Sequence, residues 1–206
     1  MSDISTQERI KVAAAKVFTL KGMEGARMQD IADEANINKA MLHYYYKNKQ
    51  SLFEIIFQDK VTKIFSAFGG LLRAEISFED KIRQFVLHQI DIISEFPVMP
   101  LFVLLEARKN PELLVQNFKD IPLLQIRLEF TKLLNNEIEK GNIRPIKMEE
   151  LLINLMSMCV YPIVAEPMLK FVFDLNQEQY QVMIQQRKKI VADLLISDLK
   201  PKALLQ

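Results

Sequence analysis

The sequence predicts an all-α protein, with an N-terminal three-helix unit that holds a helix-turn-helix and a C-terminal helical bundle. Gly totals 5 and Pro 8 among 206 residues, too few for a β-sandwich with many tight turns. Leu, Ile, Glu, Gln, Lys and Met, which favour helices, are abundant. Apolar residues also recur at helical spacing along the chain and make up half of it, so a sizeable core can form.

The first three predicted helices are closely spaced. The first begins near Ser5, because Ser5 followed by Glu8 has capping-box spacing, and it ends near Gly22. Asn36 ends the second helix, and Asn38 caps the third. The predicted ranges are 5–22, 28–35 and 39–46.

Longer helices are predicted for the rest of the chain. Gly69-Gly70 is expected to end or bend the fourth, and Pro122 to split a helix that starts near Pro111. Pro162 and Pro167 are expected to disturb another. The predicted ranges are 49–68, 77–96, 99–109, 111–122, 122–140, 147–171 and 177–197.

One segment of the N-terminal unit excludes negative charge. The formal net charge of the chain is only +1, so any nucleic-acid site must be local. Yet no Asp or Glu occurs between Glu34 and Glu54, a stretch that holds three lysines. Two short helices joined by a three-residue turn fit a helix-turn-helix, and Asn36 suits the turn because Asn tolerates a left-handed backbone.

The third helix is predicted to have a buried and an outer side. Leu42 and Tyr46, four residues apart, share the buried side. The outer side carries Lys39, Ala40, His43, Tyr44 and Lys47. Such a helix enters the major groove of DNA by its N-terminus, where a carboxylate would face phosphate. Met41 suits a thymine methyl and Lys39 a guanine, while Lys49 lies at the start of the fourth helix, where backbone amides favour an anion.

The span from Glu8 to Phe57 resembles the DNA-binding domain of TetR-family transcriptional regulators, above all in D-I-A-D-E-A-N-I-N-K-A-M-L-H-Y-Y-Y-K-N-K-Q-S-L-F. Asn36, Ala26, Ala40, Met41 and His43 depart from the usual pattern of that family. The resemblance implies a homodimer on a near-palindromic operator in double-stranded DNA, usually a repressor, which a ligand releases. The DNA contacts it implies are Arg27, Met28, Gln29, Asn38, Lys39, Ala40, Met41, His43, Tyr44, Lys47 and Lys49. Residues 1–50 would bind DNA, and residues 51–206 would bind the effector and dimerise.

The C-terminal part is rich in Phe and Met, which can line an adaptable pocket for a small hydrophobic effector. Its prolines leave room for irregular helices. The candidate pocket residues are Phe85, His88, Met99, Phe102, Phe118, Phe130, Met156 and Cys159. For any one of them, an ordinary place in the helical core remains the alternative.

The last two long helices carry more apolar residues than one amphipathic face requires. Two such helices from each subunit would form a four-helix dimer interface. The candidate interface residues are Leu155, Ile163, Met183, Ile184, Val191 and Leu194. Packing within one subunit is the alternative.

Other classes of protein have weaker support. The single cysteine, Cys159, excludes an internal disulfide or a cysteine-based metal cluster, and two histidines do not make a metal site. There is no cofactor motif or nucleophile arrangement, so we expect no enzyme. We find no apolar signal core and no run of about eighteen apolar residues, which favours a cytoplasmic protein without a membrane partner. The alternatives are an all-helical ligand-binding or adaptor protein that no longer binds DNA and, with less support, a helical enzyme.

Overall fold

The structure is a computed structural model that describes residues 5–109, 112, 118–119 and 121–201. Every regular element in these ranges is a helix, as the fold-class prediction requires. The N-terminal helices are α1 (Thr6–Gly25), α2 (Met28–Glu34) and α3 (Lys39–Tyr45). They are followed by α4 (Lys49–Arg73), α5 (Phe78–Glu95), α6 (Val98–Lys109), α8 (Leu123–Glu139), α9 (Met148–Val164), α10 (Glu166–Val172) and α11 (Gln177–Leu199).

The predicted helix starts in the N-terminal part are confirmed by their caps. The Ser5 hydroxyl accepts a hydrogen bond from the Glu8 amide at 3.2 Å, and the Asn38 side chain accepts one from the Met41 amide at 2.7 Å. The predicted break at Gly22 is also present, since its φ of 67° interrupts the helical backbone of α1 before a last turn to Gly25. Short helices are thus fixed at their ends by local hydrogen bonds.

The fourth helix does not end at Gly69-Gly70, one of the two predicted alternatives, because α4 continues to Arg73. A glycine inside a helix costs about 1 kcal/mol relative to alanine, so packing must offset that cost. The Phe68 ring lies 5.1 Å from the ring of Phe85 and 5.5 Å from that of Phe130, measured between centroids. These contacts hold the helix just before the glycine pair, and Leu71, which is buried in the same core, holds it just after.

The single helix predicted for residues 147–171 is two helices. α9 and α10 meet at Ala165 with a bend of 70°. Pro162 lies inside α9, whereas Pro167 lies in the first turn of α10, where a missing amide costs little. Pro122 caps α8, as the predicted split requires, but most of the helix predicted for 111–122 lies outside the described residues.

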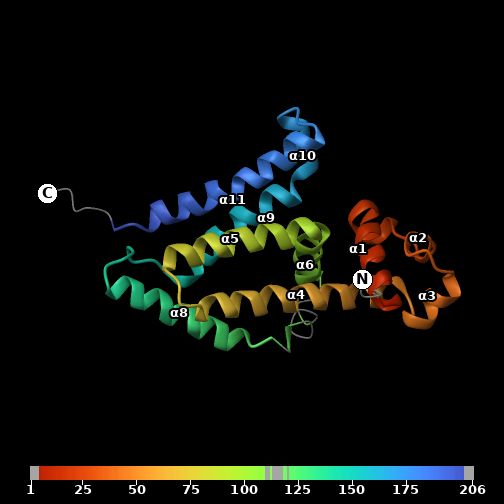
Figure 1. The fold of residues 1–206 in the computed structure, drawn as a ribbon, viewed down its shortest axis with the longest axis horizontal. Helices are drawn as coiled ribbons and strands as arrows, with labels where there is room; N and C mark the ends of the chain where they lie inside the picture. The colour runs from red at the N-terminus through yellow and green to blue at the C-terminus, as the bar shows by residue number, and fades with distance from the viewer. Residues whose placement is uncertain (1–4, 110–111, 113–117, 120, 202–206) are drawn as a thin grey trace.

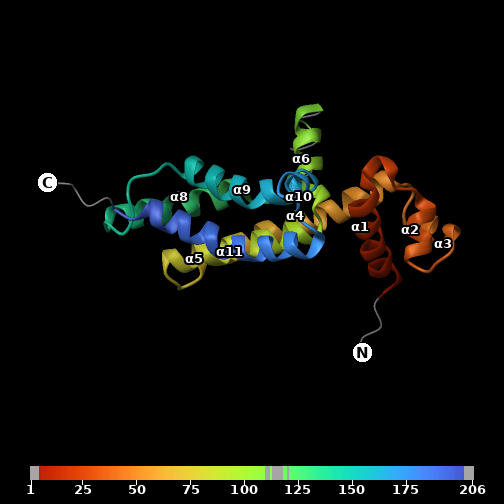
Figure 2. The ribbon, with the colours of Figure 1, turned by 90° about the horizontal axis from the view of Figure 1, so that it is seen from above.

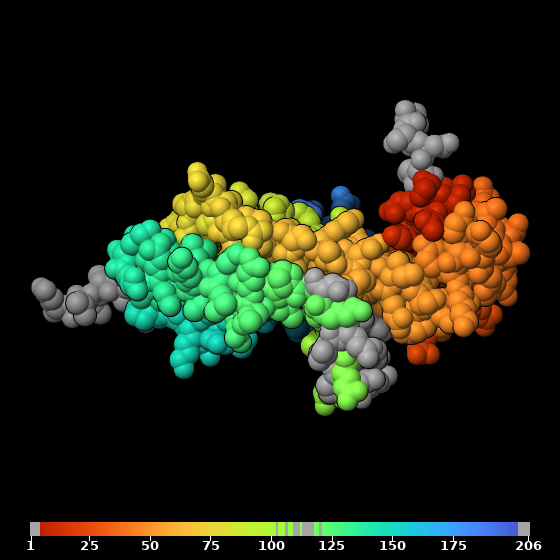
Figure 3. Space-filling model, turned by 90° about the horizontal axis from the view of Figure 1, so that it is seen from below, coloured from red at the N-terminus to blue at the C-terminus, as the bar shows by residue number. Residues whose placement is uncertain are grey.

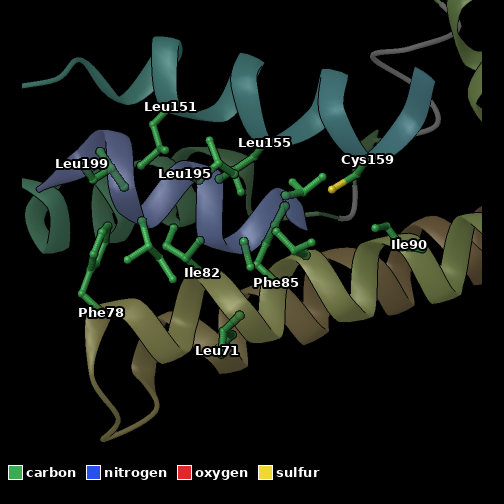
Figure 4. Close-up of a cluster of buried hydrophobic side chains, with 14 of the residues drawn as sticks. Leu71, Phe78, Ile82, Phe85, Ile90, Leu151, Leu155, Cys159, Leu195 and Leu199 are labelled. Carbon is green, nitrogen blue, oxygen red and sulfur yellow. The ribbon is translucent and has the colours of Figure 1, made fainter. Parts of the chain in front are cut away.

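α4 connects the two ends of an elongated molecule (Figure 1). α1 to α3 form one end, and the described chain finishes at the other end, as the perpendicular view also shows (Figure 2). One core cluster joins α1 to α4 with Phe96 and Met99. The second joins the far half of the molecule, where side chains from α4, α5, α9 and α11 meet (Figure 4). α4 therefore contributes to both cores.

No single helix in the described ranges is long and apolar enough to cross a membrane. Two bent pairs, α5 with α6 and α9 with α10, reach that length and composition together.

Candidate nucleic-acid interface

α2 and α3 are joined by a tight turn with a left-handed residue. Asn36 has a φ of 54°, as its place in the sequence predicts. The Ile37 amide donates to the Ala32 carbonyl at 3.0 Å. Ile31 and Leu42 are fully buried between the two helices and α1. The crossing of α2 and α3 is therefore set by the turn and by a dry contact beneath it.

Two basic side chains hold this motif from behind, and sequence reasoning missed both roles. The Arg9 guanidinium on α1 donates to the Ala35 carbonyl at 2.7 Å and to the Asn36 carbonyl at 3.4 Å. It thereby ties α1 to the turn. An arginine one helical turn after an N-cap gives no signal of such a distant contact, because the partners are 26 and 27 residues away.

Lys49, the first residue of α4, ties that helix to the end of α1. Its ammonium donates to the carbonyls of Met23, Glu24 and Ala26, at 2.8, 3.2 and 3.1 Å. An ammonium has three N–H groups, so these bonds engage its donors. A phosphate contact by Lys49 stays a prediction, and in this structure the side chain positions α1 against α4.

The predicted division of α3 into two sides is confirmed. Leu42 and Tyr46 are buried, with 0 and 6% of their surface exposed, whereas Tyr44 is 85% exposed. The other predicted contact residues of this region that are exposed are Arg27, Gln29, Asn38, Lys39, Ala40, Met41, His43 and Lys47, while Met28 is half-buried. α2 and α3, the helices of this motif, lie at one end of the molecule (Figure 2).

The three acids of α2 each have a polar partner. Asp30 on α2 lies 3.0 Å from the Lys21 ammonium, whose hydrogen bond lowers the pKa of that carboxyl. Asp33 accepts a hydrogen bond from the Gln29 amide at 2.7 Å. Glu34 pairs with Lys16 at 2.6 Å. With no acid on α3 itself, the exposed lysines Lys39 and Lys47 give this surface its charge.

Aromatic contacts connect the motif to the rest of the protein. Phe18 on α1 meets Phe53 on α4 edge to face, with centroids 5.2 Å apart. Phe53 also lies 5.7 Å from Phe96, which follows α5. Lys11 on α1 pairs with Asp59 on α4, and this hydrogen bond raises the pKa of the lysine. The orientation of the helix-turn-helix therefore depends on α4 and on the end of α5.

The predicted effector-pocket residues do not meet in one described cavity. Phe85, Phe130 and Cys159 are buried in the far core, with Met156 packed against it. Met99 and Phe118 belong to the core nearest to the DNA-binding end, and His88 is exposed. The side chain of Phe102 lies outside the described residues. Burial raises the pKa of the Cys159 thiol to about 12. The pocket stays a prediction.

The predicted dimer residues are divided between the inside and the outside of the subunit. Four of them are buried in the subunit's own core, as the alternative of packing within one subunit predicts: Leu155, Ile163, Ile184 and Val191. Met183 is half-buried, and Leu194 is 54% exposed. Helix periodicity alone did not separate core from outer positions, because α9 and α11 pack against each other and against α5.

Within the described parts of the chain, no group of three or more His, Cys, Asp or Glu side chains is placed to hold a metal ion. A capped three-helix unit with a basic outer helix, joined by one long helix to a helical bundle, is the architecture of a helix-turn-helix protein.

Comparisons with known proteins show what the N-terminal part of the chain is similar to. Residues 10–56 match the family model of bacterial regulatory proteins of the tetR family. The transcriptional repressor KstR2 of Mycolicibacterium smegmatis is 21% identical over 141 residues, which cover 68% of this chain and 69% of that protein. The transcriptional repressor SCO4008 of Streptomyces coelicolor is 40% identical over 57 residues, or 28% of this chain and 30% of that protein. Other curated relatives, such as the uncharacterized regulator YhgD of Bacillus subtilis and the regulator IcaR of Staphylococcus aureus, are matched over 53 and 26% of their length.

The solved structures extend this likeness to the fold of the whole chain. The transcriptional regulator FadR from Bacillus subtilis, solved in complex with stearoyl-CoA, has a TM-score of 0.62 at 16% identity. The match covers 93% of this chain and 98% of that one. The N-terminal domain is thus a TetR-family DNA-binding domain, and the chain has the fold of TetR-family transcriptional regulators.

Proposed function

We propose that the protein is a cytoplasmic repressor that binds a near-palindromic operator as a homodimer and leaves it when a small hydrophobic effector binds. The observation that carries the proposal is the outer side of α3. It is exposed and free of acids, and it lies on a turn that Arg9 braces from behind. A surface of this kind suits the major groove, where lysines neutralise phosphate and release counterions.

The first turn of α3 would carry the base contacts. The Asn38 side chain is engaged as the cap, so the next residues reach furthest into the groove. Lys39 suits a guanine edge, and Met41, 42% exposed, suits a thymine methyl. Tyr44 and Lys47, further along α3 and just beyond it, would contact sugar and phosphate. Arg27 and Gln29 at the start of α2 would approach the neighbouring backbone.

Residues 51–206 would bind the effector and dimerise. The end of α4 nearest to the DNA-binding unit is fixed to α1 through Lys49, and the other end packs into the far core. A ligand that displaces the far part of α4 would therefore change the orientation of the helix-turn-helix. The stearoyl-CoA complex belongs to FadR, and it supports an apolar effector here only as a likeness of fold.

The dimer would use the outward residues of the last long helices. The exposed apolar side chains there are Ile153 and Tyr161 on α9 and Val182, Ile190 and Leu194 on α11. Exposed apolar side chains on two neighbouring helices suit an interaction site, and two helices from each subunit would make a four-helix interface.

The direct test is fluorescence anisotropy with DNA from upstream of the protein's own gene, at two salt concentrations and beside scrambled DNA. We expect tight, sequence-dependent binding that weakens with salt and is lost in Lys39→Glu. Lys147→Glu is the matched control, because Lys147 is exposed and precedes α9, outside the helix-turn-helix. If weak binding were equal on scrambled DNA and genome-wide selection recovered no site, the ligand-binding or adaptor protein without DNA affinity would replace the proposal.

A further inference from the structure

A cavity of about 420 Å³ lies between α4 and α8, apart from the pocket residues predicted from sequence. Figure 3 shows the face on which these two helices lie side by side. One part of its lining is apolar and comes from Phe65, Ile121 and Ile126. Ile121 and Ile126 are nearly buried, with 8 and 7% of their surface exposed. The volume falls in the usual range of small-molecule sites.

The other end of the cavity is polar and carries a cation. Arg73, the last residue of α4, donates from Nη1 to Oε2 of Glu129 at 3.0 Å. The second oxygen of that carboxylate accepts from the Gln125 amide at 2.9 Å. Arg73 and Gln125 both line the cavity. The Arg73 side chain is 61% exposed, so this end opens to solvent.

Gly69 lies next to the Arg73 guanidinium. A Cβ built on Gly69 would be 3.4 Å from Nη2 of Arg73, at the border of ordinary van der Waals contact, and Gly69 itself lines the cavity. The same atom built on Gly70 would meet nothing within 4 Å. A methyl group at position 69 would therefore touch the Arg73 guanidinium, whereas one at position 70 would not.

We propose that this cavity binds a single-chain amphiphile with an anionic head. The tail would lie against the apolar lining, and the head would pair with Arg73 in place of Glu129. Arg offers a fork of donors that suits carboxylate and phosphate alike. A second, more open cavity of about 750 Å³ is also lined by Arg73 and adds Lys132, so a larger head has room on that side. This inference rests on the proposed function, since it names the class and the site of its effector.

Isothermal titration calorimetry tests the site with decanoate and decyl phosphate, each below its micelle concentration, and with decanol below its solubility limit. Decanoate and decyl phosphate distinguish the two sources of anionic head, and decanol has the same tail without charge. We expect the wild type to bind at least one anion about tenfold more tightly than decanol. Arg73→Gln should remove that advantage and leave decanol affinity unchanged.

Two further comparisons separate a binding role from a structural one. Glu129→Gln should raise affinity for the anion, because the ligand no longer competes with a carboxylate for Arg73. Gly69→Ala should weaken anion binding, whereas Gly70→Ala, the same change one residue along, should not. Arg83→Gln, which removes a surface pair with Asp193, controls for loss of an arginine. Circular dichroism melts would verify that each variant folds.

Equal affinity of decanol and both anions, no binding of any probe to the wild type, or an Arg73→Gln variant that keeps the anion's advantage would overturn the inference. Anisotropy with operator DNA on the same wild-type preparation, without ligand, separates its failure from that of the proposed function. DNA binding without anion binding would sink only the site. Anion binding without DNA binding would sink the repressor and leave a ligand-binding protein.

Discussion

The DNA-binding end and the helical bundle differ in how their helices are buried, with one buried side on α3 and several on the helices of the bundle. In α3, helix periodicity separated buried Leu42 and Tyr46 from the exposed lysines correctly. In α9 and α11, it could not separate buried Leu155 and Val191 from exposed Leu194. A short helix with one neighbouring layer has one buried side, whereas a helix packed among several others has more than one. Local sequence therefore specifies the DNA-facing surface better than the surfaces of the bundle.

The largest expected effect is on stability, from a substitution at the contact between the DNA-binding end and the bundle. Phe53 is almost fully buried and meets both Phe18 in α1 and Phe96 after α5. Phe53→Ala should lower the free energy of unfolding by about 3–5 kcal/mol, measured by urea denaturation. If the two regions were independent, the variant would unfold in two steps with the bundle's step unchanged. We expect instead that the bundle is destabilised as well.

One lysine in each region can be compared directly, because each donates to three carbonyls at a helix end. Lys49 does so at the end of α1, and the buried Lys81 does so at the end of α4, with Leu71, Leu72 and Ala74. Lys49→Met and Lys81→Met should each destabilise the protein by about 1–3 kcal/mol, since the carbonyls lose their donors. Denaturation measures this cost.

Lys49→Met and Lys81→Met should differ in their affinity for operator DNA. At a temperature where both remain folded, Lys49→Met should weaken operator binding, because α1 and the motif it holds shift against α4. Lys81→Met should bind like the wild type. Equal losses in anisotropy titrations would mean that overall stability, and not the placement of the motif, controls binding.

A smaller effect is expected at the turn. Arg9→Met removes the donors to the carbonyls of Ala35 and Asn36 and should cost about 1 kcal/mol of stability. We expect operator affinity to fall by more than this change in stability explains, because the turn orients α3. Lys147→Met, which alters an exposed lysine at the start of α9, is the control. Unchanged affinity in Arg9→Met would show that the turn keeps its shape unaided.

The smallest effect is a pH dependence confined to the bundle. Burial raises the pKa of Tyr180 to about 12, from an ordinary value of 10.0, and its hydroxyl donates to the Pro162 carbonyl. The unfolded chain loses this proton first, so the stabilisation is complete below pH 10 and declines as the pH rises toward 12. Tyr180→Phe should decline less over that window in thermal melts. An identical decline in both proteins would mean that other groups cause the pH dependence. The next candidate is the Cys159 thiol, whose pKa burial raises from 9.0 to about 12.

Caps and turns were the most predictable features. Ser5, Asn38 and Asn176 accept hydrogen bonds from amides three residues on, a pattern visible in sequence. The continuation of α4 through Gly69-Gly70 was not predictable from the sequence, because the contacts that hold it come from α5 and α8. The structural roles of Arg9 and Lys49 could not be predicted either, because their hydrogen-bond partners lie more than twenty residues away in the sequence. The cavity beside Arg73 likewise depends on helices that only the fold brings together.

The central claim is that the outer side of α3 reads DNA. Its most direct test is the slope of log affinity against log salt for the wild type, Lys39→Gln and Lys147→Gln on DNA from upstream of the gene and on scrambled DNA. We predict that Lys39→Gln reduces the magnitude of the slope by about 1 and narrows the gap between the two DNAs, because Lys39 reads a base edge beside phosphate. Lys147→Gln should match the wild type. Slopes that are the same for all three proteins, with equal affinity for both DNAs, would contradict the account.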